Sequence, residues 1–283
     1  MSSHPGRGGL GRARPYIAAA AVLGALLAGG SSRAEASAQI APPDRIAAAG
    51  RIVYCAALSA PPLGYLDENA KPAGLNVDLG DDVAKRMGVA AEWRIVPFKG
   101  IIPALLAQQC DAILSQLFDK PERREVIGFV DYMYSSEALL VKAGNPRNVR
   151  GLDDLSGVKV AVNTGTTIQG LIQAQNQRFA SAGKAPAELV VFPKDTDALQ
   201  QLEIGQTEVY GTTLETAAYY MMRAPNRFEV AGPPFDRVPT GIGFRKNDAP
   251  FGAALQRALD AARADGTYRR IFAKWGLEGD MLP

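Results

Sequence analysis

The chain has 283 residues, of which 47% are hydrophobic, so it is long enough for two domains with cores of their own and is not disordered throughout. Its formal charge at pH 7 is only +2. This balance gives no electrostatic reason to expect a nucleic acid as a partner.

The first 38 residues are arranged like a secretory signal peptide. Three arginines precede the apolar run 17–28, and a series of small residues ends at Ala38. The run is too short for a stable membrane-spanning helix, which disfavours the alternative of an N-terminal anchor. No cysteine precedes Cys55, which excludes a lipid-modified cysteine at the cleavage point. We therefore expect an exported protein of the periplasm that carries no lipid anchor.

Cleavage after residue 38 changes the chemistry of the chain. It removes four arginines and one glutamate, which leaves a formal charge of −1, and it removes His4, the only histidine. Ser-His and Cys-His catalytic pairs and imidazole zinc sites are thereby excluded. We expect neither a metal nor a cofactor, and no later segment is apolar enough to enter a membrane.

Two cysteines remain, Cys55 and Cys110. In an exported protein a disulfide is the first interpretation. Two buried free thiols are the alternative, whereas two thiolates without histidine do not complete a tetrahedral metal site.

The first predicted elements follow a linker at 39–50. Branched residues and turn signals mark the strands, and Val77, Leu79, Val83 and Met87 share one face of a helix that Gly88 ends. The predicted order is strand 51–58, helix 76–88, strand 91–98, helix 99–109 and strand 110–118.

The same alternation then begins again. An apolar run that ends at Val141 is predicted to be the strand that leaves the first set of elements. The second set is predicted as strand 158–165, helix 166–180, strand 187–194, helix 195–206 and strand 207–213, followed by strand 240–246 and helical segments 250–266 and 267–276.

This order predicts an α/β fold of two lobes. Strands that alternate with helices indicate a mainly parallel sheet in each lobe, flanked by helices. The last strand has no partner in the second set, so we expect it to return to the first lobe and to complete a hinge of two crossing segments. The predicted division is lobe 1 at 51–141 and 240–283, and lobe 2 at 142–239.

Five segments of the chain stand out together: PAGLNVDLGDDVAKRMG, FKGIIPALLAQQCDAI, PERREVIGFVDYMY, VAVNTGTT and ALDAARADGTYRRIFAKWG. In this order, over about residues 51–280, they resemble a known family, the periplasmic solute-binding proteins of polar amino-acid type that serve ABC importers. The resemblance implies a type II periplasmic binding protein fold that closes on a small ligand. It also implies an ABC permease of the inner membrane as partner, and we expect a monomer.

The motif PERR has two adjacent arginines at the end of strand 110–118. Ligands of open α/β sheets bind beyond the carboxyl ends of the strands, and arginine holds a carboxylate through two parallel hydrogen bonds. The resemblance assigns carboxylate binding to Arg123, and we expect Arg124 in solvent. The alternative for Arg123 is a surface salt bridge to Glu122 or Glu125.

The stretch NTGTTIQG joins a strand to a helix. Gly165, Thr166 and Thr167 are therefore predicted to offer free backbone N–H groups to an anion, unless the threonines only cap the helix. The resemblance favours Thr166 and Thr167 as ligand contacts. It also implies a contact at Ser115, for which a turn-capping hydroxyl is the alternative.

Four further positions bear on the shape of the pocket. Phe98 matches an apolar ligand contact of the family, although a phenylalanine at a strand end is as often part of a core. Phe118 replaces a residue that is often small, so it either narrows the pocket or lines it. Ala57 and Ala60 replace acidic or aromatic contacts, which implies a wide pocket of low polarity.

The family anchors an ammonium group with an aspartate, and this chain has Thr213 at the matching position. A buried ammonium without a carboxylate partner is costly. Either Glu215 substitutes for the aspartate, or the ligand carries no α-ammonium. The alternative for Glu215 is an ordinary solvated carboxylate on a helix.

Two other functions stay open at this point. Cyclohexadienyl dehydratases resemble the chain at the same arginine, but their acid is a glutamate where this chain has Gln169, and an amide is no general acid. We therefore expect no enzyme. A periplasmic sensor without an importer is the second alternative.

Overall fold

A computed structural model describes residues 40–283, so the predicted signal peptide lies outside the described residues. None of the helices in 40–283 has both the length and the apolar character that crossing a bilayer requires. In chain order the elements are α1 (Asp44–Ala49), β1 (Arg51–Ala56), β2 (Ser59–Ala60), β3 (Gly64–Leu66), β4 (Pro72–Ala73), α2 (Leu75–Arg86), β5 (Ala90–Ile95), η1 (Phe98–Gly100), α3 (Ile101–Leu106), β6 (Ala112–Phe118), α4 (Pro121–Arg124), β7 (Ile127–Lys142), η2 (Leu152–Asp154), β8 (Lys159–Asn163), α5 (Thr167–Ser181), β9 (Glu188–Phe192), α6 (Asp195–Glu203), β10 (Val209–Thr213), α7 (Leu214–Arg223), β11 (Phe228–Val230), β12 (Phe235–Arg245), α8 (Ala249–Ala264), α9 (Thr267–Trp275) and η3 (Glu278–Asp280).

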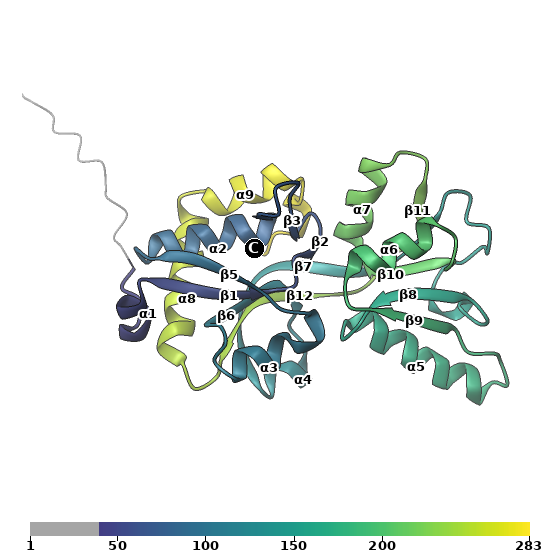
Figure 1. The fold of residues 1–283 in the computed structure, drawn as a ribbon, viewed down its shortest axis with the longest axis horizontal. Helices are drawn as coiled ribbons and strands as arrows, with labels where there is room; N and C mark the ends of the chain where they lie inside the picture. Colours follow the sequence, from purple (N-terminus) through teal and green to yellow (C-terminus); the bar gives the residue numbers. More distant parts are fainter. Residues whose placement is uncertain (1–39) are drawn as a thin grey trace, which may run out of the picture. The chain divides into compact units, whose positions relative to one another are not determined.

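The main sheet runs through both lobes (Figure 1). Its order is β5-β1-β6-β12-β7-β10-β8-β9, and β11 pairs with β7. The strands β5, β1 and β6 of lobe 1 are parallel, as are β10, β8 and β9 of lobe 2. The predicted α/β fold is thus confirmed. A small second sheet, β2-β3-β4, was not predicted.

The long strands β7 and β12 form the hinge between the lobes. They pair with each other from Arg245↔Ile127 to Phe235↔Glu137. Strand β12 also pairs with β6 of lobe 1, and the far end of β7 pairs with β10 of lobe 2, where Thr213 lies opposite Glu137. The last predicted strand therefore does return to lobe 1, but it begins earlier, at Phe235, than the sequence indicated.

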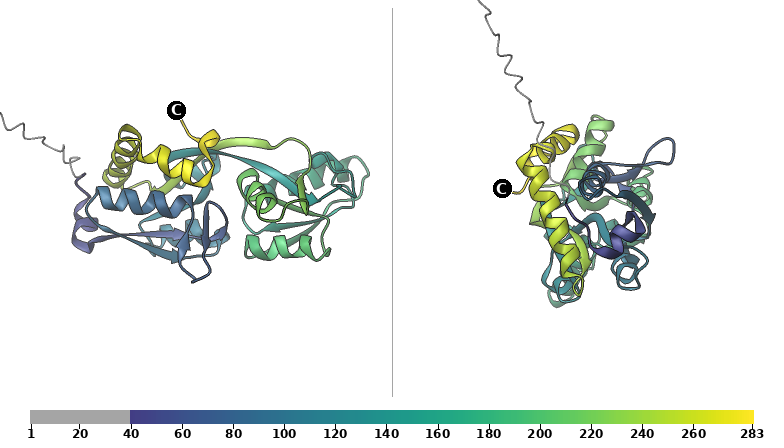
Figure 2. Two further views of the ribbon diagram at one scale, coloured as in Figure 1. Left: turned by 90° about the horizontal axis from the view of Figure 1, so that it is seen from above. Right: turned by 90° about the vertical axis from the view of Figure 1, so that its left-hand side faces the viewer.

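The core of lobe 1 follows the alternation of its strands. Ile52 and Tyr54 of β1 face a large cluster built with α2, α8 and α9, which lie together in Figures 1 and 2. Val53 and Cys55 point to the opposite face, where α3 packs. Successive side chains of a strand point to opposite faces, so one short strand contributes to two cores.

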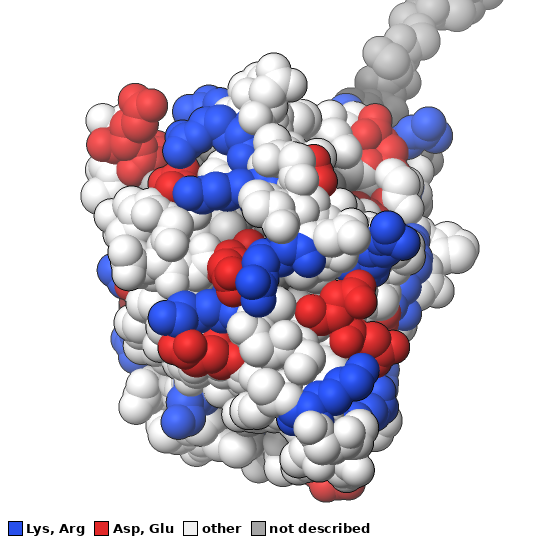
Figure 3. Space-filling model, turned by 90° about the vertical axis from the view of Figure 1, so that its right-hand side faces the viewer, with Lys and Arg blue, Asp and Glu red and all other residues white. Residues whose placement is uncertain are grey.

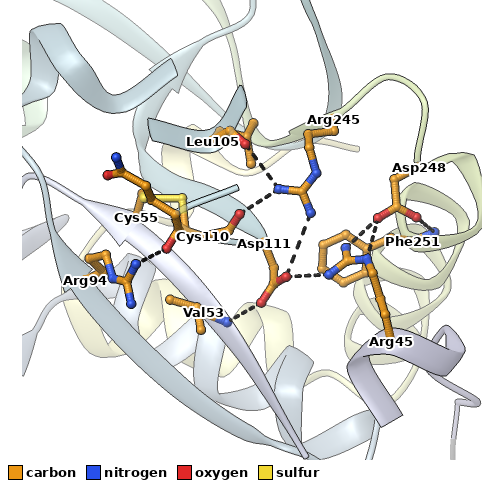
Figure 4. Close-up of polar contacts among 11 residues, drawn as sticks. Arg45, Val53, Cys55, Arg94, Leu105, Cys110, Asp111, Arg245, Asp248 and Phe251 are labelled. Carbon is orange, nitrogen blue, oxygen red and sulfur yellow. Dashed lines mark hydrogen bonds and ion pairs between the residues drawn. A yellow bond between two sulfur atoms is a disulfide. The ribbon is translucent and has the colours of Figure 1, made fainter. Parts of the chain in front are cut away.

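The disulfide Cys55–Cys110 is confirmed, and it lies in the α3 cluster of lobe 1 (Figure 4). Beside it, Asp111 accepts a hydrogen bond of 2.8 Å from the backbone N–H of Val53 and pairs with Arg45 of α1. Figure 4 also shows that Nε of Arg45 donates a hydrogen bond to the carboxylate of Asp248.

The predicted linker at 39–50 is therefore wrong in part. It contains helix α1, whose Ile46 is buried in the core of lobe 1. The short length of α1 explains why the sequence did not reveal it, because six residues carry little helical periodicity.

Lobe 2 buries both faces of its strands. Val160 and Val162 of β8 pack with α5, whereas Ala161 packs with α6 and α7 on the other face. Residues 138–141 of β7 alternate between the same two clusters. The packing of lobe 2 therefore begins a few residues before the predicted boundary at Val141, because the crossing occurs inside β7.

Candidate functional site

A pocket lies where the lobes face each other, beyond the carboxyl ends of β1, β6 and β8. It contains about 630 Å³ of space not filled by atoms, part of which is open solvent. Lobe 1 lines it mainly with apolar side chains, among them Ala57, Ala60 and Leu63. Lobe 2 contributes threonines.

Arg123 lines this pocket from the short helix α4, which directly follows β6. Its Nη1 donates a hydrogen bond of 2.9 Å to the carbonyl of Phe118, and its guanidinium lies 5.9 Å from the centroid of the Phe98 ring. Burial lowers the pKa of Arg123, and the negative charges of Glu122 and Glu137 partly offset this decrease. Arginine nevertheless stays charged at neutral pH.

The two adjacent arginines have different environments. The side chain of Arg124 is 54% exposed and pairs with Asp119 and Asp131 outside the pocket. Within residues 40–283, Arg123 forms no ion pair, so the alternative of a surface salt bridge to Glu122 or Glu125 does not occur there. Arg123 is partly buried, and a guanidinium without an ionic partner is available to an anion.

Ser115, Phe98 and Phe118 also line the pocket. The hydroxyl of Ser115 accepts a hydrogen bond of 2.9 Å from the N–H of Ala57, which fastens β6 to the end of β1. Phe98 packs against the α3 cluster as well, so its core and pocket roles coexist. Phe118 is 3% exposed and lines the pocket from the end of β6.

The turn from β8 into α5 differs in part from the prediction. Gly165 is not a lining residue, and its N–H is not free, because it donates a hydrogen bond of 2.7 Å to Oε1 of Gln169. Its φ is +83°, and an added Cβ would come within 2.8 Å of the Cα of Lys99 in lobe 1. The position therefore requires glycine for its backbone conformation and for the close approach of the lobes.

Thr166 and Thr167 do line the pocket. The hydroxyl of Thr166 donates a hydrogen bond of 2.6 Å to the carbonyl of Asn163 and makes no capping bond to α5. The alternative that Thr166 only caps the helix is therefore wrong. The start of α5 leaves its first backbone N–H groups near the pocket, where a helix attracts negative charge.

Thr213 and Glu215 occupy different places. Thr213 lines the pocket, and its hydroxyl caps α7 and accepts a hydrogen bond of 3.0 Å from Nε2 of Gln116. Glu215 is 3% exposed and does not line the pocket. Its Oε2 accepts hydrogen bonds from Ser135 (2.8 Å) and Gln116 (3.2 Å).

The expectation of a solvated carboxylate at Glu215 is therefore wrong, because the side chain lies under the pocket wall. Burial raises its pKa to about 7. Its Oε1 has no hydrogen-bond partner among the described residues. The other interpretation, that Glu215 substitutes for the missing aspartate as an ammonium partner, is not supported, because Glu215 does not line the pocket.

Two acids that the sequence analysis did not select line the pocket, Glu137 of β7 and Asp195 of α6. Asp195 accepts hydrogen bonds from Asn163 (2.6 Å), Tyr210 (2.7 Å) and, across the cleft, Ser59 (3.4 Å). Burial raises its pKa, and these hydrogen bonds oppose the rise. Glu137 is 2% exposed, and its pKa lies well above the ordinary range because of burial.

A signal for Glu137 existed in the sequence. A single carboxylate inside the apolar run YMYSSEALLV indicates a buried charge, which is rare without a function or a partner. Asp195 gave no such signal, because an aspartate at the start of a helix is common on surfaces. Among the described residues, no cluster of three or more histidine, cysteine or acidic side chains is arranged to hold a metal ion.

Two α/β lobes hinged by two strands around a pocket with a partly buried arginine agree with a family match. The family profile for bacterial extracellular solute-binding proteins, family 3, matches residues 52–278. The chain belongs to this family.

Relatives of this solute-binding protein cover most of its length. The lysine/arginine/ornithine-binding periplasmic protein of Escherichia coli K12 is 29% identical over 221 residues, which are 76% of this chain and 83% of the relative. An ancestral arginine-binding protein bound to arginine has a TM-score of 0.73 at 31% identity and covers 80% of this chain and 98% of its own.

A third similar structure is an ancestral amino-acid-binding protein described as a precursor of cyclohexadienyl dehydratase. It has a TM-score of 0.74 at 28% identity and covers 82% of this chain and 98% of its own. The type II two-lobed fold of this solute-binding protein is confirmed by these likenesses.

Proposed function

We propose that this protein binds a small solute with a carboxylate group, an amino acid or a related compound, in the pocket between its lobes. The supporting observation is the partly buried guanidinium of Arg123, which lines the pocket and forms no ion pair within residues 40–283. Partial burial removes some of the water around this cation, and a carboxylate can replace that water through two charge-assisted hydrogen bonds.

The proposed mechanism is closure of the lobes on the ligand. Arg123 belongs to lobe 1 and the turn at Thr166 and Thr167 to lobe 2, so only the closed arrangement offers both to one carboxylate. A ligand shifts a conformational equilibrium only through such a difference in contacts. The hydrogen bond between Ser59 and Asp195 and the approach of Gly165 to Lys99 support a cleft that fits together when closed.

The family and its periplasmic relatives support the same cellular role. The protein acts in the periplasm, as a monomer, and delivers its solute to an ABC permease of the inner membrane. The face in Figure 3 carries Lys, Arg, Asp and Glu side chains interspersed, so it has no broad field of one sign that would favour nucleic acid.

A thermal-shift screen tests the proposal. The panel contains the common amino acids, their desamino acids, their neutral amides and a set of sugars. We expect a rise in the unfolding temperature with one or a few carboxylates and none with the matching amides. Stabilisation by sugars or amides, without any carboxylate, would contradict the proposal.

An enzymatic role is the second candidate, because a precursor of a dehydratase is structurally similar. At the position of the dehydratase acid this chain has Gln169. Its Oε1 accepts a hydrogen bond from the N–H of Gly165, so the side chain stabilises the turn before α5. We therefore propose binding without catalysis. Incubation with prephenate should give no phenylpyruvate; its appearance would establish the enzymatic role.

A further inference from the structure

Glu137 lies in the hinge strand β7, at the place where both lobes meet the pocket. Its ladder partner in β10 is Thr213, and its partner in β12 is Phe235. Directly paired residues of antiparallel strands point to the same face of the sheet, with Cβ atoms about 5 Å apart. The side chain of Glu137 is therefore a neighbour of Thr213, the position at which the family has its ammonium-binding aspartate.

The hydrogen bonding of Glu137 sets it apart from the other buried acids. Asp195, which lines the pocket, accepts hydrogen bonds from three side chains. Glu215, which does not line the pocket, accepts hydrogen bonds from two. Glu137 receives no side-chain hydrogen bond from the described residues, although it is 2% exposed and lines the pocket. The carboxylate oxygens of Glu137 are absent from the set of fully enclosed atoms that lack a hydrogen-bond partner. Because they have no partner within residues 40–283, they must keep some exposed surface.

The cations near Glu137 are engaged elsewhere. Lys120 pairs with Asp236 at 2.9 Å, and Arg123 donates to the carbonyl of Phe118. Neither forms an ion pair with Glu137, although both stabilise its ionised form at longer range. Burial outweighs them and, with Asp236 and Glu215 as further negative neighbours, keeps the pKa of Glu137 high. An additional positive group in the pocket would remove this imbalance.

We propose that Glu137 binds a positively charged ammonium group of the solute, while Arg123 binds its carboxylate. This inference rests on the proposed function and narrows the ligand class to zwitterionic amino compounds. The two protein charges and the two ligand charges then balance inside a desolvated pocket, which neither a plain carboxylic acid nor a plain amine achieves.

The test compares matched ligands by calorimetry at pH 7.5. The probes are L-leucine with 4-methylpentanoate, L-phenylalanine with 3-phenylpropanoate, and the equivalent pair for any other amino acid that stabilises the protein. For the natural sequence we expect the amino form to bind at least 30-fold more tightly than its desamino partner. Equal or tighter binding of the desamino form overturns the inference and leaves carboxylate binding intact.

The variant Glu137→Gln keeps the shape of the side chain and removes its charge. We expect at least a 30-fold loss of affinity for the amino form and at most a threefold change for the desamino form. The control Glu188→Gln removes a charge from a side chain of β9 that is 64% exposed and does not line the pocket, and it should change neither affinity. An unchanged preference in Glu137→Gln overturns the inference.

The comparison of ligands on the natural sequence does not depend on the folding of any variant. If no carboxylate of either kind binds, the proposed function itself fails, and the assignment of Glu137 fails with it. If carboxylates bind without a preference for the amino form, only the assignment of Glu137 fails.

Discussion

The two walls of the pocket use their polar groups differently. Lobe 1 presents Arg123 without an ionic partner among the described residues, beside the ring of Phe98 and the backbone carbonyl of Phe118. Lobe 2 presents Asp195, which three donors already satisfy, and Thr213, whose hydroxyl caps a helix. Lobe 1 and the hinge therefore hold the charges available to a ligand, and lobe 2 mainly supplies a preformed surface that closes over it.

The largest effect should come from the disulfide that stiffens lobe 1. Cys55 and Cys110 are 55 positions apart, and the chain-entropy relation for a loop of that length gives a stabilisation of about 4 kcal/mol. The double variant Cys55→Ala/Cys110→Ala should lose about this much free energy of unfolding in a denaturant titration. An unchanged midpoint would mean that lobe 1 does not depend on its cross-link.

The next effect concerns the affinity itself. Arg123→Ala leaves the carboxylate of the ligand desolvated and unpaired, so affinity for the best amino acid of the panel should fall by 100-fold or more, about 3 kcal/mol. Arg124→Ala is the matched control, because Arg124 pairs with Asp119 outside the pocket. Equal losses in both variants, measured by calorimetry, would remove the distinction between the adjacent arginines.

The next effect concerns the pH dependence of stability that the buried carboxylate of Glu215 should cause. Its pKa is about 7 in the folded protein and near 4.3 when unfolded, so the folded state binds the proton more tightly. The free energy of unfolding should therefore fall as pH rises from 5 to 8, by roughly 2–3 kcal/mol from this residue.

Glu215→Gln should remove that part of the pH dependence in denaturant titrations at pH 5, 6, 7 and 8. The control Glu188→Gln changes a side chain that is 64% exposed and should leave the profile as it is. Identical profiles for the natural sequence and Glu215→Gln would show that the carboxylate is not buried in the way described.

The smallest expected effect lies at the contact between the lobes. In Gly165→Ala, the positive φ and the approach to Lys99 oppose closure, so ligand affinity should fall about tenfold, or about 1.4 kcal/mol. Gly170→Ala is the control, because its added Cβ meets nothing within 4 Å. A loss of affinity in the control, or none at Gly165, would mean that this contact does not limit closure.

Much of the fold followed from local patterns. Alternating strands and helices predicted two α/β lobes, and a last strand without a local partner predicted the second hinge crossing. The features that were missed depend on distant contacts. Helix α1 is held by Arg45 reaching Asp111 and Asp248, which are far away in the sequence.

The site was predictable where a residue type carries its chemistry on its own. An arginine at the end of a buried strand and threonines at a helix start indicate anion binding, and the structure brings Arg123, Thr166 and Thr167 to one pocket. The hydrogen bonding of Glu137, Asp195 and Glu215 was not predictable, because it depends on which donors other elements bring near each carboxylate. Glu215 was expected either in the pocket or in solvent, and it lies in neither place.

The central claim is that Arg123 binds the carboxylate of the solute. A double-mutant cycle tests it most directly, with Arg123→Ala on the protein and a neutral amide in place of the carboxylate on the ligand, all four affinities being measured by calorimetry. We predict a coupling energy of about 2–3 kcal/mol, because each change alone already removes the same ion pair. Additive losses, with a coupling near zero, would contradict the claim.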